Sequence, residues 1–412
     1  MAELSEGAGS ATRLRDIKIV SLVGAAHFMS HVYVIMLPPL FLFARTEYGV
    51  SFTELGFAMS VFGFFSATLQ TPAGFVVDRL GSGTLLIAAL VLSGIGAAII
   101  GLVPFYWALL LGFACLGIAN TIYHPADYAI LSHGVSAPRI AQAYSIHTFL
   151  GMAGQAVTPV IMLAMAGIWG WRSGFLGIAV VSYLVAIALL LQKGSLSDRR
   201  VVGPRGGETT AKAQPGGWKL LLSGPILRSF VFFAFLTMTG SALANFSIVV
   251  LGGLYDTPIT VANAALTAFL IFNALGVLSG GVIANRFKNP AAIVTAGLGA
   301  SGVTIVILAF TNFSAAFLVV MLGVTGFLNG MIMPSRDLIV RAVTPPGSFG
   351  LVFGFVSTGF SISGVIAPPL YGWLMDQGEP RVIYLCAAVF TALSLLMARS
   401  AKPSPQASGA IL

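Results

Sequence analysis

The sequence predicts an all-α, polytopic membrane protein with twelve transmembrane helices arranged as two six-helix bundles. Three observations support this prediction: an apolar composition, long uninterrupted apolar runs, and a pattern that recurs in the two halves of the chain. Of the 412 residues, 57% are hydrophobic and 8% are charged, whereas about a quarter of the residues in a soluble domain are charged. So few charges exclude a soluble globule of this length.

Twelve apolar runs are long enough to cross a bilayer. A spanning helix needs about 20 apolar residues, because each residue rises 1.5 Å and the hydrocarbon core is about 30 Å thick. The runs are continuously apolar rather than alternating, and an open sheet cannot satisfy its edges in lipid, so strands are not expected. We expect the spans at 17–43, 54–77, 83–103, 105–131, 138–165, 171–193, 226–252, 260–284, 291–310, 313–341, 348–375 and 380–399.

Lysine and arginine residues predict the orientation of these spans. With the N-terminus inside, the outer segments hold only Arg45, Arg172 and Arg381, and Arg336 lies within a span. The other basic residues all fall in inner segments or tails. We therefore expect a multi-pass protein of the inner (plasma) membrane with both termini in the cytoplasm. These inner basic residues also account for the net charge of +8, so nucleic acid is not expected as a partner.

One long polar stretch divides the chain into two sets of six spans. It contains glycine, proline and charges of both signs, which is typical of a flexible linker. The predicted organisation is a cytoplasmic N-terminal tail at 1–16, a first bundle at 17–193, a cytoplasmic linker at 194–219, a second bundle at 220–399 and a cytoplasmic C-terminal tail at 400–412.

The two halves repeat a pattern. The stretch "GIANTIYHP" at 117–125 aligns with "GFLNGMIMP" at 326–334, so that Asn120 matches Asn329 and Pro125 matches Pro334. Near the second span of each half, "GFVVDRLG" at 74–81 aligns with "GVIANRFK" at 281–288. Because each half has an even number of spans, the repeats share one topology. We therefore expect a pseudo-two-fold axis along the membrane normal.

Twelve spans as two parallel repeats with a basic central loop resemble the Major Facilitator Superfamily. The stretch "GFVVDRLG" is similar to the Gly-x-x-x-Asp-Arg-x-Gly loop of that superfamily, and its second copy lies where the symmetry requires. The resemblance implies a conformational role for this loop motif; the alternative is an ordinary polar turn. The residues of the motif are Gly74, Asp78, Arg79 and Gly81 in the first copy, and Asn285 and Arg286 in the second.

A closer resemblance covers most of the first half. The stretches "AAHFMSHV", "VSFTELGFAM", "TLQTPAGFVVD" and "ANTIYHPADYAILS" are similar to segments of the fosmidomycin-resistance-type exporters. That group tends to have Asp where this chain has His31, and His-Pro-Glu where this chain has Ala126 after "HP". The identity of the solute is therefore not carried over from the resemblance.

Ionisable residues within the spans indicate a functional site. His27 and His31 share one helix face, and His124 and Asp127 share another. Such residues are costly in lipid and by default face a cavity, where they act on solute or protons, and histidine changes charge near physiological pH. In the superfamily the first and fourth spans line the central cavity, so the resemblance places both faces there. The alternative is neutral histidines bonded to carbonyls between packed helices.

Asp127 has a second interpretation as half of a gate. Its counterpart in the repeat is Arg336, and the superfamily brings the two spans together at the cytoplasmic mouth. A carboxylate and a guanidinium at matched depth would pair across the halves. Two local alternatives compete: Arg336 pairs with Asp337 or extends to the inner surface, or Asp337 pairs with Arg341.

The sequence predicts residues for solute binding and for proton coupling, but no metal site. A metal held by His27, His31, His124 and Asp127 is chemically possible, but no spacing fixes all four on one centre. We therefore expect no metal and no cofactor. The predicted solute-binding residues are His27, His31, Tyr123, His124, Asn245, Asn273, Asn329 and Arg336, and the predicted proton-coupling residues are His27, His31, His124 and Asp127.

The function that fits these observations is secondary active transport of a small solute by alternating access. The resemblance favours proton-coupled antiport and efflux of an anionic or drug-like compound. The first alternative is proton-coupled uptake of an organic anion such as a carboxylate, and the second is a non-transporting membrane sensor or scaffold. No nucleophile–base pair or phosphate loop is visible, so an enzyme is not expected. The expected partners are the solute, protons and the lipid bilayer, and we expect a monomer.

Overall fold

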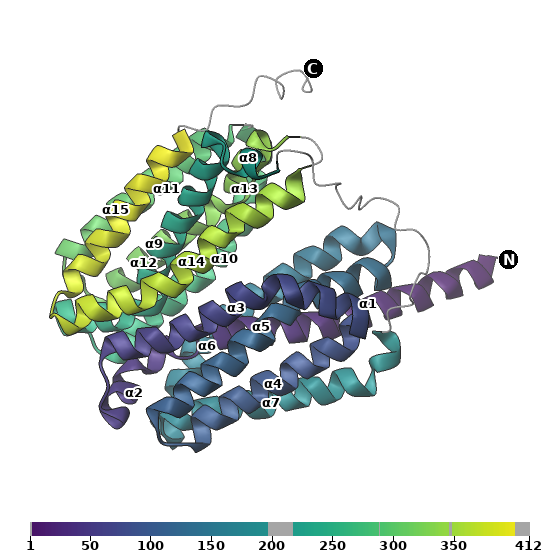
Figure 1. The fold of residues 1–412 in the computed structure, drawn as a ribbon, viewed down its shortest axis with the longest axis horizontal. Helices are drawn as coiled ribbons and strands as arrows, with labels where there is room; N and C mark the ends of the chain where they lie inside the picture. The colour runs from purple at the N-terminus through teal and green to yellow at the C-terminus, as the bar shows by residue number, and fades with distance from the viewer. Residues whose placement is uncertain (1, 197–216, 288, 346–347, 400–412) are drawn as a thin grey trace. The chain divides into compact units, whose positions relative to one another are not determined.

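The computed structural model describes residues 2–196, 217–287, 289–345 and 348–399, and these residues form helices and turns without a strand. Twelve of the helical segments are long and apolar enough to cross a membrane (Figure 1). The predicted all-α polytopic fold is confirmed. The predicted linker at 194–219 lies almost entirely outside the described residues.

The chain divides into two compact units. One contains Met1–Val50 and Val61–Val202, and the other contains Ser51–Ser60 and Gly203–Leu412. We call them the first and the second unit. One helix therefore contributes its first turns to the second unit and its remainder to the first.

The first unit is built from seven helices. A 3₁₀ turn at Pro38–Leu40 separates the first two, since successive prolines cannot donate the backbone hydrogen bonds that would continue the helix. The helices are α1 (Ala2–Ile35), α2 (Phe41–Tyr48), α3 (Phe52–Leu80), α4 (Ser82–Leu102), α5 (Tyr106–Gly134), α6 (Ile140–Trp169) and α7 (Trp171–Leu191).

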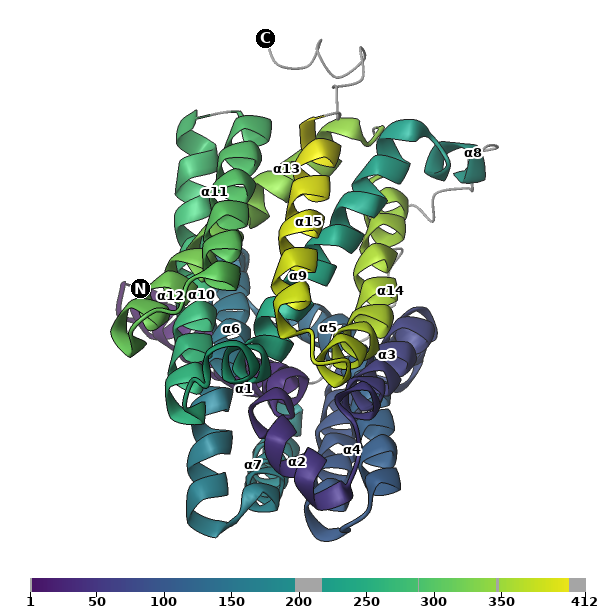
Figure 2. The same cartoon turned by 90° about the vertical axis from the view of Figure 1, so that its left-hand side faces the viewer.

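The second unit contains eight further helices, which are drawn from teal to yellow in Figures 1 and 2. Its apolar core at one end is formed by Phe232 and Phe233 together with aliphatic side chains from several of these helices. The helices are α8 (Gly217–Leu221), α9 (Gly224–Tyr255), α10 (Ile259–Phe287), α11 (Pro290–Phe310), α12 (Ala315–Met331), α13 (Met333–Val343), α14 (Phe349–Asp376) and α15 (Pro380–Arg399).

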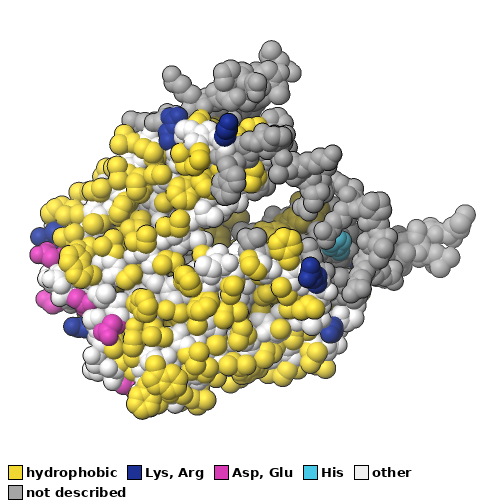
Figure 3. All heavy atoms as spheres, viewed as in Figure 1, with side chains coloured by type: hydrophobic (Ala, Val, Ile, Leu, Met, Phe, Trp, Pro, Cys, Tyr) yellow, Lys and Arg dark blue, Asp and Glu magenta, His cyan; other side chains and the backbone are white. Residues whose placement is uncertain are grey.

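Large apolar side chains cover the outer faces of both units. Leu191 is 76% exposed and Val282 is 70% exposed, and the visible face in Figure 3 is mostly hydrophobic, with charged side chains near the helix ends. Exposed apolar surface of this extent is unfavourable in water but suits contact with lipid chains. The surface therefore agrees with twelve membrane-spanning segments.

Equivalent contacts occur in the two units at the positions that the sequence repeat pairs. A Cβ on Gly117 of α5 would lie 2.6 Å from the Phe62 carbonyl oxygen of α3, and a Cβ on Gly326 of α12 would lie 2.1 Å from that of Phe269 of α10. Side chains reinforce both crossings. Ser66 Oγ donates to the Gly117 carbonyl at 3.2 Å, and Asn273 Nδ2 donates to the Gly326 carbonyl at 3.3 Å.

One paired position behaves differently in the two units. Pro125 lies inside the continuous helix α5. Its counterpart Pro334 lies in the first turn of α13, directly after a break that ends α12 at Met331. A proline is tolerated in the first turn of a helix because its missing N–H has no partner to lose there. The second unit therefore divides into two helices the span that the first unit keeps as one.

Candidate functional site

The candidate functional site of the first unit is a buried carboxylate surrounded by imidazole rings. Asp127 of α5 has no exposed surface. Its Oδ2 atom lies 3.1 Å from Nε2 of His147 on α6 and 3.2 Å from Nδ1 of His27 on α1. Three helices thus meet at one oxygen atom.

Two further histidines extend this group. The His31 ring centroid lies 4.8 Å from that of His27, and the His124 ring centroid lies 5.2 Å from it. His124 is exposed, whereas His27 and His147 are buried. We call Asp127, His27, His147, His31 and His124 the acid–histidine cluster.

Glycines allow this approach of three helices. A Cβ on Gly151 of α6 would lie 2.7 Å from Nε2 of His27 and 2.8 Å from Cδ2 of His31, and a Cβ on Gly154 would lie 2.3 Å from the Phe28 carbonyl oxygen. The missing side chains let α1 and α6 pack at close range. The imidazoles of α1 can therefore lie beside α6 and reach the carboxylate of α5.

The polar atoms of the cluster are incompletely satisfied. His147 Nε2 and Asp127 Oδ2 form a hydrogen bond. Nδ1 of His27 makes none, despite its short distance to the carboxylate, and neither do Oδ1 of Asp127 and Nδ1 of His147. Buried polar atoms without partners are costly, and a functional role is one reason for which a protein keeps them.

His147 is the member of this cluster that the sequence did not assign to the site. It was visible only as one of five histidines in the first half. Its spacing carried a signal, because His147, Gly151 and Gly154 lie on one helix face at i, i+4 and i+7. A histidine on a glycine-lined face lies where another helix approaches.

Three members of the cluster form a group of described residues that could hold a metal ion. His27, Asp127 and His147 each offer one ligand atom, and these atoms lie within 4.8 Å of one another. The sequence expectation of no metal considered a different combination, in which His31 and His124 replaced His147.

Tyr123, a predicted solute-binding residue, lies in the core of the first unit with no exposed surface. Its hydroxyl and that of Ser93 are 3.0 Å apart. The Tyr33 hydroxyl lies 2.5 Å from that of Ser182, and the two tyrosine rings are 6.4 Å apart. These side chains join α1, α4, α5 and α7 through a buried polar network.

The three predicted asparagines of the second unit make contacts within that unit. Asn245 Nδ2 donates to Ser241 Oγ one turn earlier on α9. Asn329 Nδ2 donates to Ser301 Oγ on α11, and Asn273 bonds α12 as described above. The amide groups of Asn273 and Asn329 hold neighbouring helices together, and a solute contact for any of the three stays a prediction.

Arg336 pairs with its neighbour in the sequence. Its Nε donates to Asp337 Oδ1 at 2.9 Å, and its Nη2 lies 2.8 Å from the same atom. The guanidinium also lies over the rings of Phe233 and Phe360, at 4.6 and 5.2 Å from their centroids. The structure therefore shows the first local alternative for Arg336, and a gate between Asp127 and Arg336 stays a prediction.

Both copies of the loop motif lie at the end of a helix. Arg79 is exposed near the end of α3, and Gly81 has φ +91° between α3 and α4, a conformation that favours glycine. Asn285 and Arg286 are exposed in the last turn of α10. Gly74 lies within α3, and the side chain of Asp78 is outside the described residues. The conformational role of the motif stays a prediction.

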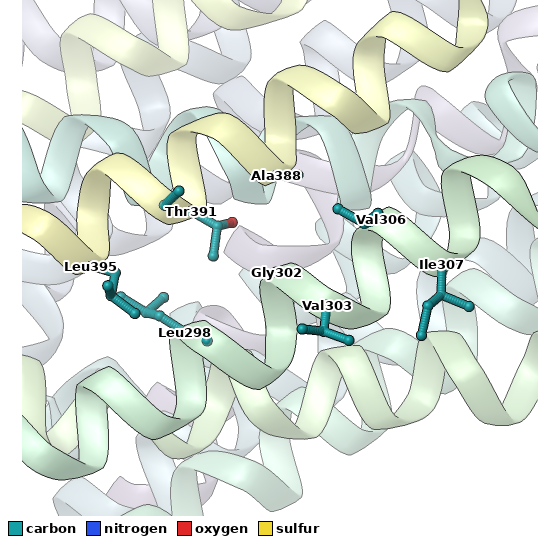
Figure 4. Close-up of a pocket in the computed structure, with 10 residues that line it drawn as sticks. Leu298, Gly302, Val303, Val306, Ile307, Ala388, Thr391 and Leu395 are labelled. Carbon is teal, nitrogen blue, oxygen red and sulfur yellow. The ribbon is translucent and has the colours of Figure 1, made fainter.

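Two cavities lie outside the acid–histidine cluster. One, of about 390 Å³, lies between α11 and α15; its lining is apolar except for Thr391 (Figure 4), so it offers nothing to a charged solute. The other, of about 400 Å³, lies between α1 and α6 and includes Arg13, Asp16 and Arg139. Asp16 there accepts hydrogen bonds from Ser136 and Arg139.

Comparisons with known proteins identify the family. The model of the Major Facilitator Superfamily matches residues 23–257 and 230–410. The "Probable sulfoacetate transporter SauU" of Cupriavidus necator is 24% identical over 396 residues, covering 89% of this chain and 88% of that protein. The fosmidomycin resistance protein of Escherichia coli is 22% identical over 395 residues, covering 94% of each.

Solved structures show the same fold. A bacterial homologue of the human lysosomal transporter Spinster superposes with a TM-score of 0.77 at 15% identity, covering 96% of this chain and 99% of that one. This similarity agrees with the family match, the twelve spans and the repeated contacts. The chain belongs to the Major Facilitator Superfamily of transporters.

Proposed function

We propose that this transporter moves a small organic anion across the inner membrane by alternating access, and that the acid–histidine cluster couples this movement to protons. The observation that carries the proposal is the Asp127 carboxylate, which is fully buried in a membrane-spanning bundle and contacts two imidazoles through one oxygen.

The chemistry of the cluster suits a proton carrier. An ionised carboxylate in a dry protein interior is unfavourable unless it is paired or protonated. Here the partners are imidazoles, which accept or release a proton themselves. A proton can therefore lie on Asp127, His27 or His147 with little movement of heavy atoms, and its presence changes the charge at the meeting point of α1, α5 and α6.

The negative charge of the solute and the direction of transport are supported by different observations. Sulfoacetate, named for one relative, is a small organic anion, and Arg336 is a cation within a span, 13% exposed. The resistance named for another relative favours efflux, and therefore proton antiport. Uptake of an organic anion is the alternative direction. The excess of Lys and Arg in the inner segments supports cytoplasmic termini and an inner-membrane location.

Proteoliposomes test the coupling. With sulfoacetate as the first probe, wild-type protein should accumulate solute when a pH gradient is imposed and should also exchange labelled for unlabelled solute without one. Asp127→Asn should lose at least about tenfold of the gradient-driven accumulation, because an amide cannot take up the coupling proton; loss of a proton-transfer group in an enzyme costs about 10²–10⁴-fold. It should retain exchange.

A matched control is His133→Ala. His133 is an exposed histidine of α5 whose ring contacts the Ala129 carbonyl rather than the cluster. This variant should behave as wild type in both assays. Gradient-driven accumulation by Asp127→Asn at the wild-type rate would overturn the assignment of the coupling proton to the cluster.

A further inference from the structure

We propose that Nδ1 of His27, Oδ2 of Asp127 and Nε2 of His147 form a binding site for a divalent transition-metal ion such as Zn²⁺. The three atoms come from α1, α5 and α6 and lie within 4.8 Å of one another. All three residues are buried. Two imidazoles and a carboxylate are ligands that zinc and its neighbours in the first transition series accept.

The distances between the ligand atoms fit coordination. Oδ2 of Asp127 lies 3.2 Å from Nδ1 of His27 and 3.1 Å from Nε2 of His147. Metal–nitrogen and metal–oxygen bonds of about 2.0–2.2 Å in a tetrahedral site separate neighbouring ligand atoms by about 3.3–3.6 Å. The two oxygen–nitrogen distances are therefore within a few tenths of an ångström of those that an ion needs, and the two nitrogens lie within 4.8 Å of each other.

The hydrogen-bonding state of these atoms supports a ligand role. Nδ1 of His27 is buried, lies at contact distance from a carboxylate and yet forms no hydrogen bond. Its approach to Asp127 is thus short without the direction that a hydrogen bond needs. A metal ion shared by both atoms would satisfy them together. Oδ1 of Asp127 also lacks a partner and is available as a second contact to the ion.

The stacking of the two rings determines what coordination would require. The His27 and His147 rings stack with centroids 3.6 Å apart and planes 22° from parallel. A metal–nitrogen bond lies in the plane of its imidazole, so one of the two rings would turn out of the stack to bring both nitrogens onto one ion. The neutral form of each ring is the one that binds metal.

The cluster has an exposed side. His124 is exposed and its ring lies 5.2 Å from that of His27. Tyr128 is 45% exposed and its ring lies 5.4 Å from that of His147. Three protein ligands would leave a fourth coordination position for water or an anionic ligand.

Metal binding has a consequence for transport. The ion would occupy the carboxylate oxygen to which we assign the coupling proton, so Zn²⁺ should inhibit gradient-driven accumulation. That consequence rests on the proposed function, whereas binding of the ion does not. The metal site and the proposed function can therefore each be disproved without the other.

Cobalt spectroscopy on the purified full-length protein tests the site. Tetrahedral Co²⁺ absorbs visible light far more strongly than hydrated Co²⁺. Titration of wild-type protein should give such a band that saturates at one ion per chain and disappears when Zn²⁺ is added. Absence of the band in wild-type protein would overturn the proposal without recourse to any variant.

Variants locate the ion. His147→Ala and Asp127→Asn should abolish the band, and His133→Ala should leave it at wild-type intensity. Gly151→Ala keeps every ligand but crowds His27, and should weaken Co²⁺ binding by at least about tenfold, the lower end of what misplaced ligands cost. A band that survives in His147→Ala would show that the ion binds elsewhere and would contradict the proposed metal site. An intact band in a protein without proton-coupled transport would contradict the proposed function but not the metal site.

Discussion

At the scale of single residues, two aspartates of this protein meet opposite environments. Asp127 is enclosed, and one of its oxygens has no hydrogen-bond partner. Asp376, at the end of α14, accepts hydrogen bonds from the Phe52 and Thr53 backbone N–H groups at 2.9 Å and from the Thr53 hydroxyl at 2.6 Å. It thus caps the first turn of α3 within the second unit. The first carboxylate is held at a cost to stability, and the second contributes to stability.

We expect the two Asp→Asn substitutions to change thermal stability in opposite directions. Asp127→Asn replaces a buried ionisable group by a neutral one of similar shape, so its apparent melting temperature should equal or exceed that of wild type. Asp376→Asn weakens a helix cap, which should cost about 1–2 kcal/mol. Scanning fluorimetry of both variants in one detergent measures the contrast. A marked loss of stability in Asp127→Asn would show instead that the carboxylate stabilises the bundle.

The sequence located Asp127, His27, His31 and His124 as site candidates but not the contact between them. Helical spacing predicts which residues share a face of one helix, and so it paired His27 with His31 and His124 with Asp127. The crossing of α1, α5 and α6 depends on how glycines such as Gly151 meet side chains of another helix. That information lies in packing rather than in spacing, and for this reason His147 was not assigned to the site.

At the scale of helices, two glycines one turn apart on α6 serve different purposes. Gly151 makes room for imidazole side chains, and Gly154 makes room for the backbone of α1 at Phe28. A side chain can shift by rotation, whereas a backbone carbonyl moves only with its helix. The two positions therefore separate effects on the site from effects on packing.

We expect Gly151→Ala to impair proton-coupled transport more than stability and Gly154→Ala to do the reverse. Overpacking of a tight interface typically costs about 1–3 kcal/mol, and Gly154→Ala should fall within that range because its Cβ would meet a carbonyl oxygen at 2.3 Å. Melting temperature and gradient-driven accumulation, measured on both variants, give the comparison. Equal losses of both quantities in the two variants would contradict it.

Helix boundaries were predicted better than helix interruptions. The apolar runs fixed the twelve spans, because span length depends on bilayer thickness. The break at Met331 was not expected, since Pro125 and Pro334 occupy paired positions in the two halves. A proline at this position therefore does not by itself decide whether the helix is interrupted.

At the scale of the whole molecule, the predicted orientation has a direct test. Fusion of green fluorescent protein to the C-terminus should fluoresce, because that protein folds in the cytoplasm. Alkaline phosphatase inserted after Asp256, between α9 and α10, should be active because this turn is predicted to face outward. An inactive phosphatase there, or a dark C-terminal fusion, would reverse the predicted orientation.

The repeat was the part of the architecture that the sequence predicted most fully. Alignment of the halves paired Gly117 with Gly326, and the structure gives both the same contact with the second span of their unit. The histidine residues do not follow this repeat. All five histidines lie in the first half, so the repeat supplies two similar scaffolds, of which one carries the acid–histidine cluster.

The interrupted span of the second unit has a mechanical consequence. A helix bends more readily where its backbone hydrogen bonding is interrupted than along a continuous stretch. Asp127 lies on the continuous helix α5, whereas Arg336 lies on α13, the short helix that begins after Ile332. A bend at Ile332 would displace the Arg336 guanidinium, whereas Asp127 has no helix interruption beside it.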